Sequence, residues 1–414
     1  MSRAAFIRSK FSKVIIALVA TIALGFFVYK VVVHIKANNF LEFQYDISTS
    51  DPAQKGYILM APYVTTSERF SRLVIMDFAG HILVKKKVAG IVSDFRQWII
   101  NGRIRYSYAV YDPSIFLQNY SNGSVAHEVI LDSALNEIGQ VRLLPYGDVV
   151  TDNKKGIDHH DFIMLSDNHF ITMTSYIKTV TNIPASLSPS PTVKLAVPIL
   201  QEIEDGTVIW QWDASLYPEF YAGSMKWNNY SNGKDVQDYM HVNGMIIDPA
   251  DSNLVVSFHN TNQLVKINRK TGAIIWRFGG KNSDFSLSGE QLFLWQHNPD
   301  FADSGRTLTL FDNGDKDSRH FSRILEYNLD QQNKKVTGFR SYTIPDLFAE
   351  NKGSVQVCDG NYFICGGSGN FILLTDRHTG TVKFKMTYNH TSFRAYYASD
   401  ITGITINKNF KNSD

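Results

Sequence analysis

Three histidines, His160, His241 and His297, each open a short apolar segment that leads through a polar turn into a second apolar run. The three segments read HDFIMLSDNHFITMTS, HVNGMIIDPADSNLVVSF and HNPDFADSGRTLTLF. Convergent imidazoles suit proton transfer, metal binding or the stabilisation of an anion. No HxH or HExxH spacing, which would favour a zinc site, accompanies them. We therefore expect a site for an anionic ligand, without a metal or another cofactor.

Further polar groups follow two other apolar runs. The segment SFHNTNQL adds His259 and Asn260, and the segment FDNGDKDSRHFSR adds Arg319 and Arg323. Cations beside imidazoles favour an oxyanion such as sulfate, phosphate or a carboxylate. The acidic start of the second segment, around Lys316, is typical of a solvated turn.

The stretch NHTSFRAYY, near the end of the chain, offers His390, Ser392 and Arg394 beside three aromatic rings. A serine attacks only with an adjacent base, which one of the histidines above could supply. The sequence holds no nucleotide-binding loop, GxSxG elbow or paired-carboxylate signature. Phosphate-loop and α/β-hydrolase chemistry are therefore not indicated.

The elements that must position these side chains are β-strands. Helical periodicity is nearly absent after the first forty residues, and one hairpin-like pattern, an apolar run on either side of a polar turn, recurs along the chain. Six copies are found, at residues 73–86, 127–143, 200–212, 263–278, 323–342 and 371–386. A repeat of this kind predicts an all-β fold, a six-bladed β-propeller, with a pair of β-sandwiches as the alternative. Because the innermost strands of a propeller surround its axis, histidines at one phase of different blades would converge.

The composition narrows the class of protein. The chain has 414 residues, of which 44% are hydrophobic and 13% aromatic, and its formal net charge is +2. A chain of this length can bury a large core. Because its positive and negative charges nearly balance, the charge does not suggest a nucleic-acid surface. We expect a small-molecule or protein partner and no nucleic acid.

The N-terminal residues differ from the rest. A basic start precedes VIIALVATIALGFFVY, an apolar run long enough to cross a bilayer with the basic side left inside. A cleaved signal peptide is the alternative, although no small-x-small cleavage site clearly follows the run. The predicted organisation is a basic cytoplasmic tail (1–13), a transmembrane helix as an uncleaved anchor (14–34), a linker (35–50) and an exterior propeller (51–405).

Two cysteines, Cys358 and Cys365, flank the turn DGNY. In an oxidising compartment they could form a disulfide, and two buried thiols on a hairpin are the equal alternative.

The order of the motifs matches a known family. The segments KGYILMAPY, HHDFIML, LQEIEDGTVIWQW, DYMHVNGMIIDP, WQHNPDF, TLTLFDNG and TSFRAYY resemble the arylsulfotransferases, the PAPS-independent bacterial aryl-sulfate sulfotransferases and their relatives. The similarity runs from about residue 50 to 400 and is most specific between Asp238 and Gly314. It implies a six-bladed propeller whose central channel moves a sulfuryl group between phenols, through a sulfated histidine and without a nucleotide donor.

The resemblance also implies roles for single residues. His241 of MHVN and His297 of WQHN fall on the family's sulfate-contacting histidines, and His259 falls on the histidine after the next strand. Arg319 is the best match to the family's catalytic arginine after FDNG, although the spacing differs. Ser392 stands where a THYRA-like sequence carries the nucleophilic histidine, so this chain resembles a branch with serine at that position.

We therefore expect a membrane-anchored propeller on the periplasmic or extracellular side that transfers sulfuryl groups between an aryl sulfate and a phenol. The expected catalytic residues are His241, His297, Arg319 and Ser392, and the expected substrate-binding residues are His160, His259, Asn260 and Arg394. A homodimer is possible. The alternative is a non-catalytic propeller that binds an anionic aromatic ligand or an envelope partner at the same place.

Overall fold

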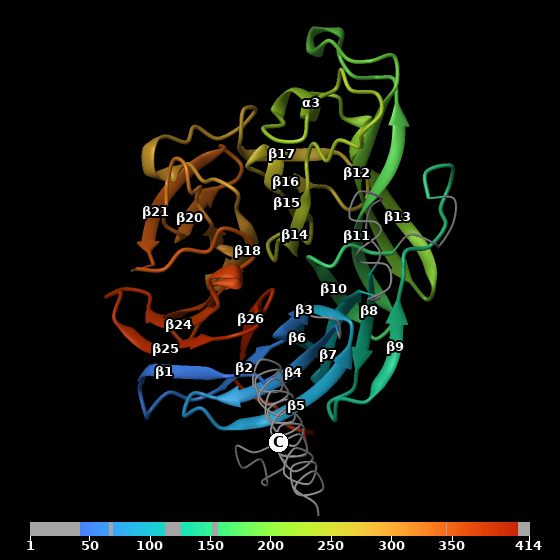
Figure 1. Cartoon of the computed structure of the whole chain (residues 1–414). Coiled ribbons are helices and arrows are strands. Elements are labelled where there is room, and N and C mark those ends of the chain that lie inside the picture. The colour runs from blue at the N-terminus through green and yellow to red at the C-terminus, as the bar shows by residue number, and fades with distance from the viewer. Residues whose placement is uncertain (1–41, 66–68, 112–125, 151–155, 345, 405–414) are drawn as a thin grey trace, which may run out of the picture. The chain divides into compact units, whose positions relative to one another are not determined.

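The computed structural model describes residues 42–65, 69–111, 126–150, 156–344 and 346–404. From Tyr45 onward these residues form six antiparallel sheets around a common centre (Figure 1). The predicted all-β, six-bladed propeller is confirmed.

Each blade runs from an inner strand to the rim. Blade 1 consists of β26 (Ala395–Ala398), β2 (Tyr57–Met60), β4 (Arg69–Asp77) and β5 (Ile82–Ala89), with the short β3 (Tyr63–Thr65) along β4; blade 2 of β6 (Ile91–Ile100), β7 (Arg103–Tyr111), β8 (Ala126–Leu131) and β9 (Glu137–Val141); and blade 3 of β10 (Phe162–Ser166), β11 (His169–Val180), β12 (Val193–Glu204) and β13 (Thr207–Asp213).

The other three blades follow the same pattern. Blade 4 consists of β14 (Val242–Ile247), β15 (Leu254–Phe258), β16 (Gln263–Ile267) and β17 (Ile274–Gly279); blade 5 of β18 (His297–Ala302), β19 (Thr307–Asp312), β20 (Arg323–Asp330) and β21 (Lys335–Thr343); and blade 6 of β22 (Ser354–Cys358), β23 (Asn361–Cys365), β24 (Phe371–Asp376), β25 (Val382–Tyr388) and β1 (Tyr45–Ser50). Short helices connect some strands: α3 (Glu219–Gly223) and the 3-10 turns Ala185–Leu187, Ala214–Leu216, His259–Thr261, Gly289–Gln291, Asp303–Gly305 and Gly367–Gly369.

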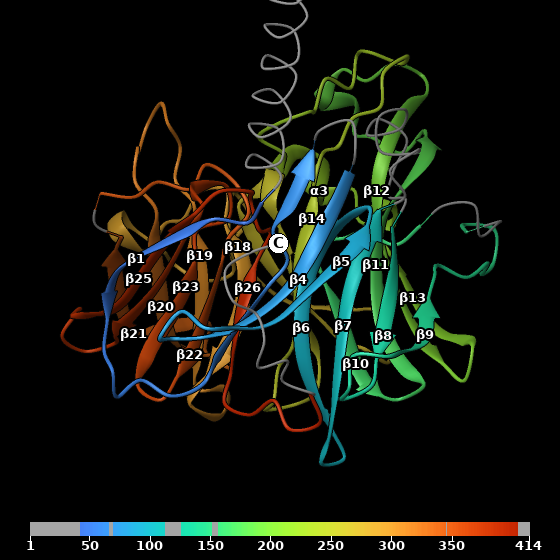
Figure 2. The same ribbon diagram turned by 60° about the horizontal axis from the view of Figure 1, so that its bottom comes forward.

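The six repeated segments of the sequence are the third and fourth strands of each blade, counted from the axis: β4–β5 in the first and β24–β25 in the last. Closure of the ring uses both ends of the chain. The C-terminal strand β26 pairs with β2 as the inner strand of blade 1, and β1 pairs with β25 at the rim of blade 6 (Figure 2). Residues 45–50, which we expected to belong to a linker, are therefore part of the propeller. Their pairing partner lies more than three hundred residues away, where no local pattern could indicate it.

Large aromatic residues fill the spaces between neighbouring blades. Trp212 and Trp276 are both buried, and each also donates a hydrogen bond to the following blade, to Gly272 O (3.2 Å) and to Gln331 Oε1 (3.0 Å). A buried tryptophan stabilises the fold through its large apolar area, and the hydrogen bond of its N–H avoids the cost of burying an unpaired polar group. Blade packing is thus specific as well as apolar.

Cys358 and Cys365 lie at opposite ends of the β22–β23 hairpin and are both free thiols. Burial raises the pKa of the two thiols, to about 12 for Cys358 and about 11 for Cys365. The structure therefore matches the second alternative, two unpaired thiols on a hairpin.

No helix within the described ranges is long and apolar enough to cross a membrane. The expected anchor, residues 14–34, lies outside those ranges.

Glu128 of β8 is fully buried in blade 2, and burial, with the nearby Asp94, raises the pKa of its carboxyl well above the usual range. An acid whose folded pKa is raised makes the fold less stable as pH climbs above its unfolded pKa of about 4.3. We therefore expect Glu128→Gln to gain stability over the parent between pH 5 and pH 8, measured by urea unfolding. The exposed Glu137→Gln on β9 is the control. If the difference in the free energy of unfolding between Glu128→Gln and the parent were the same at pH 5 and pH 8, the raised pKa of Glu128 would be refuted.

Candidate functional site at the propeller axis

The six inner strands form a closed ring in which β26, β6, β10, β14, β18 and β22 each contact the next. One polar residue stands at or near the start of each strand. The six are Arg394, Asp94, Asp161, Asn243, Asn298 and Ser354, and all are buried. Burying a polar group away from water is unfavourable unless the group is hydrogen-bonded. The hydrogen-bond partners of these six residues therefore hold the inner strands together at the axis.

Several of these six polar residues bind the backbone of the following blade. Asp161 Oδ2 accepts from Met245 N (2.9 Å) and Asn243 Nδ2 donates to Gln296 O (2.7 Å). Asn298 Oδ1 accepts from Val355 N (2.9 Å), and Ser354 Oγ donates to Ala395 O (3.0 Å). Between blades 2 and 3 the bond comes from Ser93, whose Oγ donates to His159 O (2.8 Å).

Arg394 completes the ring from the C-terminal strand. Its guanidinium lies 3.2 Å from Asp94 Oδ1 and 3.3 Å from Asp161 Oδ2, and it donates to Asn243 O at 2.9 Å. The side chain is fully buried. One planar group with several donors can satisfy three partners at once, which an ammonium cannot do in the same geometry.

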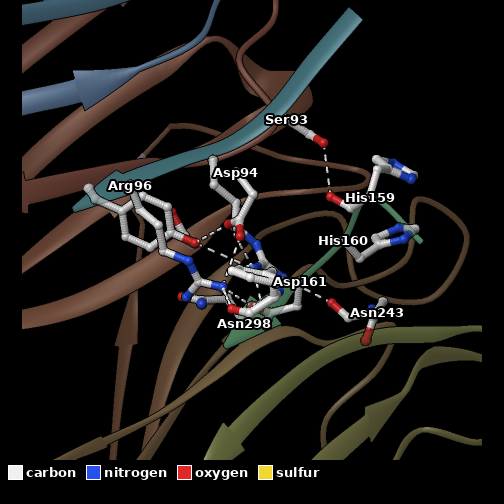
Figure 3. A network of polar contacts seen from close by, with 12 residues as sticks. Ser93, Asp94, Arg96, His159, His160, Asp161, Asn243 and Asn298 are labelled. Atoms are coloured by element: carbon white, nitrogen blue, oxygen red, sulfur yellow. Dashed lines mark hydrogen bonds and ion pairs between the residues drawn. The ribbon is translucent and has the colours of Figure 1, made fainter. Parts of the chain in front are cut away.

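Arg96 supplies a second cation to the same carboxylates. It lies 2.8 Å from Asp94 Oδ2, binds Asp161 and Phe162 O, and stacks over the ring of Trp98. Burial raises the pKa of Asp94, and the two guanidiniums oppose that rise. Figure 3 shows Asp94, Arg96 and Asp161 gathered together, with the rings of His159 and His160 to one side.

Irregular backbone at the strand starts turns these side chains toward the axis. Register shifts occur at Ser93/Arg96 in β6, at Val242/Gly244 in β14 and at His297/Asp300 in β18. Asp94 (φ 58°) and Asn298 (φ 46°) take the left-handed conformation there. Asp and Asn tolerate it better than most residues, and β-bulges are a common way to re-aim a side chain near a functional site.

Next to this network lie four imidazoles, His160, His241, His259 and His297. Their ring centroids are 5.2 Å apart for His160–His241, 5.4 Å for His241–His259, 5.4 Å for His259–His297 and 6.4 Å for His297–His160. The sequence-based expectation that histidines from different blades converge is thus met by the geometry. We call these four residues the histidine ring.

Every member of the histidine ring is held at Nδ1 by an acceptor. The partners are Asp158 Oδ1 for His160 (2.5 Å), Asp238 Oδ2 for His241 (2.6 Å), Asn260 Oδ1 for His259 (2.8 Å) and Asn313 Oδ1 for His297 (2.7 Å). Because the amide nitrogens of Asn260 and Asn313 donate to backbone carbonyls, their oxygens face the imidazoles as acceptors. Nδ1 therefore carries the proton, and in the described part of the chain Nε2 remains for a ligand.

The charge states of the four rings differ. Burial and the neighbouring imidazoles lower the pKa of His160, His259 and His297 well below the usual value. Burial also acts on His241, but Asp238 outweighs it and raises the pKa of His241. The ring therefore combines three neutral imidazoles with one that is more readily protonated.

Two lysines and two aromatic residues border the histidine ring. Lys226 Nζ lies 3.6 Å from the centroid of Trp295, which stacks on His259. Lys352 is close enough that its charge contributes to the lowered pKa of His160, and burial lowers the pKa of Lys352 itself. The ring of Phe393 packs against His160 at 5.1 Å. The result is a positive, partly aromatic environment that suits an anionic aryl ligand.

A single metal ion does not fit the histidine ring. Zinc takes imidazole nitrogens at about 2.0–2.1 Å, which brings the ligand atoms close together. Among the described residues, only Asp158, His159 and His160 offer three potential ligand atoms within 4.8 Å of one another. Two of these atoms, Asp158 Oδ1 and His160 Nδ1, are already joined by a hydrogen bond. We therefore assign no metal to the histidine ring.

Arg319 is placed differently from the expectation. Its guanidinium binds the buried Asp312 and donates to Phe321 O (3.1 Å), and Arg323 Nε holds the other oxygen of Asp312 at 2.8 Å. Both arginines thus stabilise the loop between β19 and β20. Lys316, on the same loop, is exposed and faces Glu350 at 3.5 Å.

Ser392 is also engaged in the fold. Its side chain is fully buried, its Oγ donates to Arg394 O (2.7 Å), and it accepts from Ala61 N (3.1 Å). The residue of this segment that contacts the imidazoles is Phe393, which packs on His159 and His160.

Sequence reasoning missed several members of the site: Asp158, His159, Asp238, Lys226 and Lys352. The shared phase could have revealed two of them. Lys352 precedes Ser354 by two residues as His241 precedes Asn243, and His159 precedes Asp161 in the same way. The other three lie on connecting loops without a repeated pattern.

The fold and the histidine ring together define a six-bladed propeller with four convergent imidazoles near its axis. A family model described as arylsulfotransferase (ASST) matches residues 119–389, well over half of the chain, so the protein belongs to the arylsulfotransferase family. The matched residues include the whole histidine ring and end before Ser392.

Several solved structures are similar to the chain at low identity. A protein of unknown function from Bacteroides caccae shares 10% identity with a TM-score of 0.44, over 84% of this chain and 100% of that chain. The periplasmic gluconolactonase PpgL of Pseudomonas aeruginosa shares 10% identity with a TM-score of 0.45, over 85% of this chain and 100% of that chain. No curated protein gives a significant match.

The buried arginine of the axis gives a first prediction for the site. Arg394→Ala leaves two carboxylates without one of their cations, so we expect a loss of about 3–5 kcal/mol in the free energy of unfolding. Arg394→Lys should recover only part of it, because a point charge cannot satisfy all three partners. Urea unfolding measures both, with the exposed Arg340→Ala as control. A loss below about 1 kcal/mol for Arg394→Ala would show that the axis does not depend on this charge.

The histidine ring gives a second prediction. In a pH titration of the Cε1–H signals by NMR, His241 should titrate with a pKa above the usual histidine value. His160, His259 and His297 should remain neutral down to pH values well below the usual pKa. Asp238→Asn should lower the pKa of His241, because the carboxylate is the source of the rise. Titration of all four rings near pH 6.5 would contradict the assigned environments.

Proposed function

We propose that this protein transfers a sulfuryl group between phenolic compounds at the histidine ring. The observation that supports the proposal is the ring itself: four imidazoles, oriented through Nδ1, in a member of the arylsulfotransferase family. We assign substrate contact to His241, His297, His160 and His259. Asn260 orients His259, and Arg394 supports the ring from the axis.

The physical chemistry of the reaction fits the charges around the ring. A transferring sulfuryl group, like a phosphoryl group, spreads negative charge over its peripheral oxygens, so fixed cations and hydrogen-bond donors provide most of the stabilisation. Here His241, Lys226 and Lys352 are the available positive groups. The neutral imidazoles can act as nucleophile or base, because their Nε2 lone pairs are not protonated.

Two expected catalytic residues have other roles in this proposal. Arg319 holds the loop through Asp312 and acts on the site only by positioning it. Ser392 marks the branch of the family with serine at the place of the nucleophilic histidine, and its hydroxyl serves the backbone. We also propose that residues 14–34 anchor the protein in a membrane with the propeller on the exterior side, on the evidence of the basic and apolar N-terminal sequence.

A second function, binding an anionic aromatic ligand without turnover, is favoured by one observation. The hydroxyl of Ser392, which occupies the family's nucleophile position, is committed to two backbone groups. In that case the histidine ring would bind an aryl sulfate and release it unchanged.

Transfer from p-nitrophenyl sulfate to a phenol separates the two functions. We expect nitrophenolate release that depends on the acceptor, and a fall of about 10²-fold or more in kcat/KM for both His241→Gln and His297→Gln, since each removes a group that contacts the transferring charge. Arg340→Ala, on the outer strand β21, is the control and should keep full activity. Saturable binding of p-nitrophenyl sulfate without any turnover would instead support the binding protein.

A further inference from the structure

The C-terminal segment places the aromatic ring of Phe393, and not the hydroxyl of Ser392, against the histidine ring. Phe393 packs edge-on against His159 and His160, with centroid distances of 4.9 and 5.1 Å. Ser392, one residue earlier, points its hydroxyl at the backbone of Ala61 and Arg394. If this protein transfers a group through a covalent intermediate, Ser392 is therefore not the residue that carries it.

The orienting partners distinguish the four imidazoles. His259 and His297 are held by the neutral amides of Asn260 and Asn313. His160 and His241 are held by carboxylates, those of Asp158 and Asp238. A carboxylate on Nδ1 makes Nε2 more electron-rich and stabilises the positive charge that the ring acquires when Nε2 attacks.

The two carboxylate-held imidazoles differ in surroundings. The side chain of His160 is 6% exposed and lies against His159, His241, His297 and Phe393, whereas the side chain of His241 is 27% exposed. Burial keeps His160 neutral, and Asp238 favours the protonated form of His241. A neutral imidazole can attack, and a protonated neighbour 5.2 Å away, centroid to centroid, can protonate the departing group.

His160 is also the most firmly positioned of the four. Its backbone N–H and its Nδ1 both bind Asp158 Oδ1, at 2.9 and 2.5 Å, and its ring packs against those of His159 and Phe393. The preceding backbone carbonyl, His159 O, is fixed by Ser93 of the neighbouring blade. Precise placement of the attacking atom is a large part of the advantage of a covalent route.

We propose that Nε2 of His160 is the atom that carries the sulfuryl group, with Asp158 as its positioning residue. This inference rests on the function proposed above and adds the identity of the nucleophile. Asp158 is buried beside the ring and is joined to it by the shortest of the four Nδ1 bonds.

The two half-reactions balance. In the first, the Nε2 lone pair of His160 forms an N–S bond to the aryl sulfate, the S–O bond to the aryl oxygen breaks, and that oxygen leaves with the electron pair and takes a proton from His241. In the second, the hydroxyl oxygen of the acceptor phenol forms the new S–O bond, its proton returns to His241, and the N–S pair returns to Nε2. The net change exchanges one aryl sulfate for another, without an oxidant, a reductant or a metal.

The test begins with the unaltered full-length protein. It is mixed with p-nitrophenyl sulfate in the absence of an acceptor, quenched at alkaline pH and digested, and the peptides are mapped by mass spectrometry. We expect a mass increase of one SO₃ group on the peptide that contains His160, and its disappearance when a phenol is added before the quench. An adduct on the peptide of His259 or His297, or on the peptide of Ser392, would overturn the inference.

Variants provide a second and independent readout. His160→Gly should lose both the adduct and at least about 10³-fold in turnover, and added imidazole should restore part of the turnover by occupying the vacated place. Ser392→Ala, which removes a hydroxyl that serves the backbone, should retain the adduct on the His160 peptide. Asp158→Asn should lower kcat with little change in KM, because the neutral amide stabilises the charged intermediate less well.

The outcomes separate the inference from the function on which it rests. Transfer between phenols with no adduct in the native protein, or full turnover by His160→Gly, would overturn the assignment of His160 and leave the transferase intact. A native protein without turnover and without an adduct would overturn both. A circular dichroism spectrum and urea midpoint like those of the parent confirm that His160→Gly is folded before its activity is interpreted.

Discussion

The circle of hydrogen bonds between the inner strands is the interaction on which the rest of the structure depends. Each blade donates or accepts a bond at the axis with the next, and Arg394 completes the circle by joining the C-terminal strand to blades 2, 3 and 4. A buried cation without its partners is strongly unfavourable, so Arg394 can be accommodated only when Asp94 and Asp161 are already at the axis. Closure of the propeller and neutralisation of its axis are therefore the same event.

The histidine ring inherits its geometry from this circle. His160 and His297 immediately precede two members of it, and His241 precedes a third by two residues. Bulges lie beside two of these histidines, at Val242/Gly244 after His241 and at His297/Asp300, and a bulge re-aims the side chains next to it. The charged groups differ between the two places. At the axis, carboxylates pair with guanidiniums, whereas Lys226 and Lys352 border the histidine ring and the carboxylates of Asp158 and Asp238 bind two of its imidazoles.

The sequence predicted those features that repeat. The six outer hairpins carry a period-two pattern and a polar turn, which are local properties of the chain, and the phase of His160, His241 and His297 follows from the same repeat. Features that depend on register between distant segments were out of reach. β1 pairs with a strand at the other end of the chain, and Ser392 Oγ accepts from Ala61 N. The local sequence therefore predicts neither where the propeller begins nor the hydrogen bonds of Ser392. Arg319 was misplaced for a related reason, because its partner Asp312 is a buried acid that the sequence shows only as part of a polar turn.

The segment around Ser392 differs from what the family resemblance led us to expect, and the difference is informative. Ser392 is built into the fold, because its hydroxyl joins Arg394, just before β26, to Ala61, just after β2. The ring of Phe393 follows it and packs against His160. A histidine at position 392 would have to give up both backbone bonds or leave them unmet in a buried place, at a cost of about 1–3 kcal/mol for each unsatisfied group. In this chain the C-terminal strand therefore supports the histidine ring, and on the function proposed above Ser392 takes no direct part in the reaction.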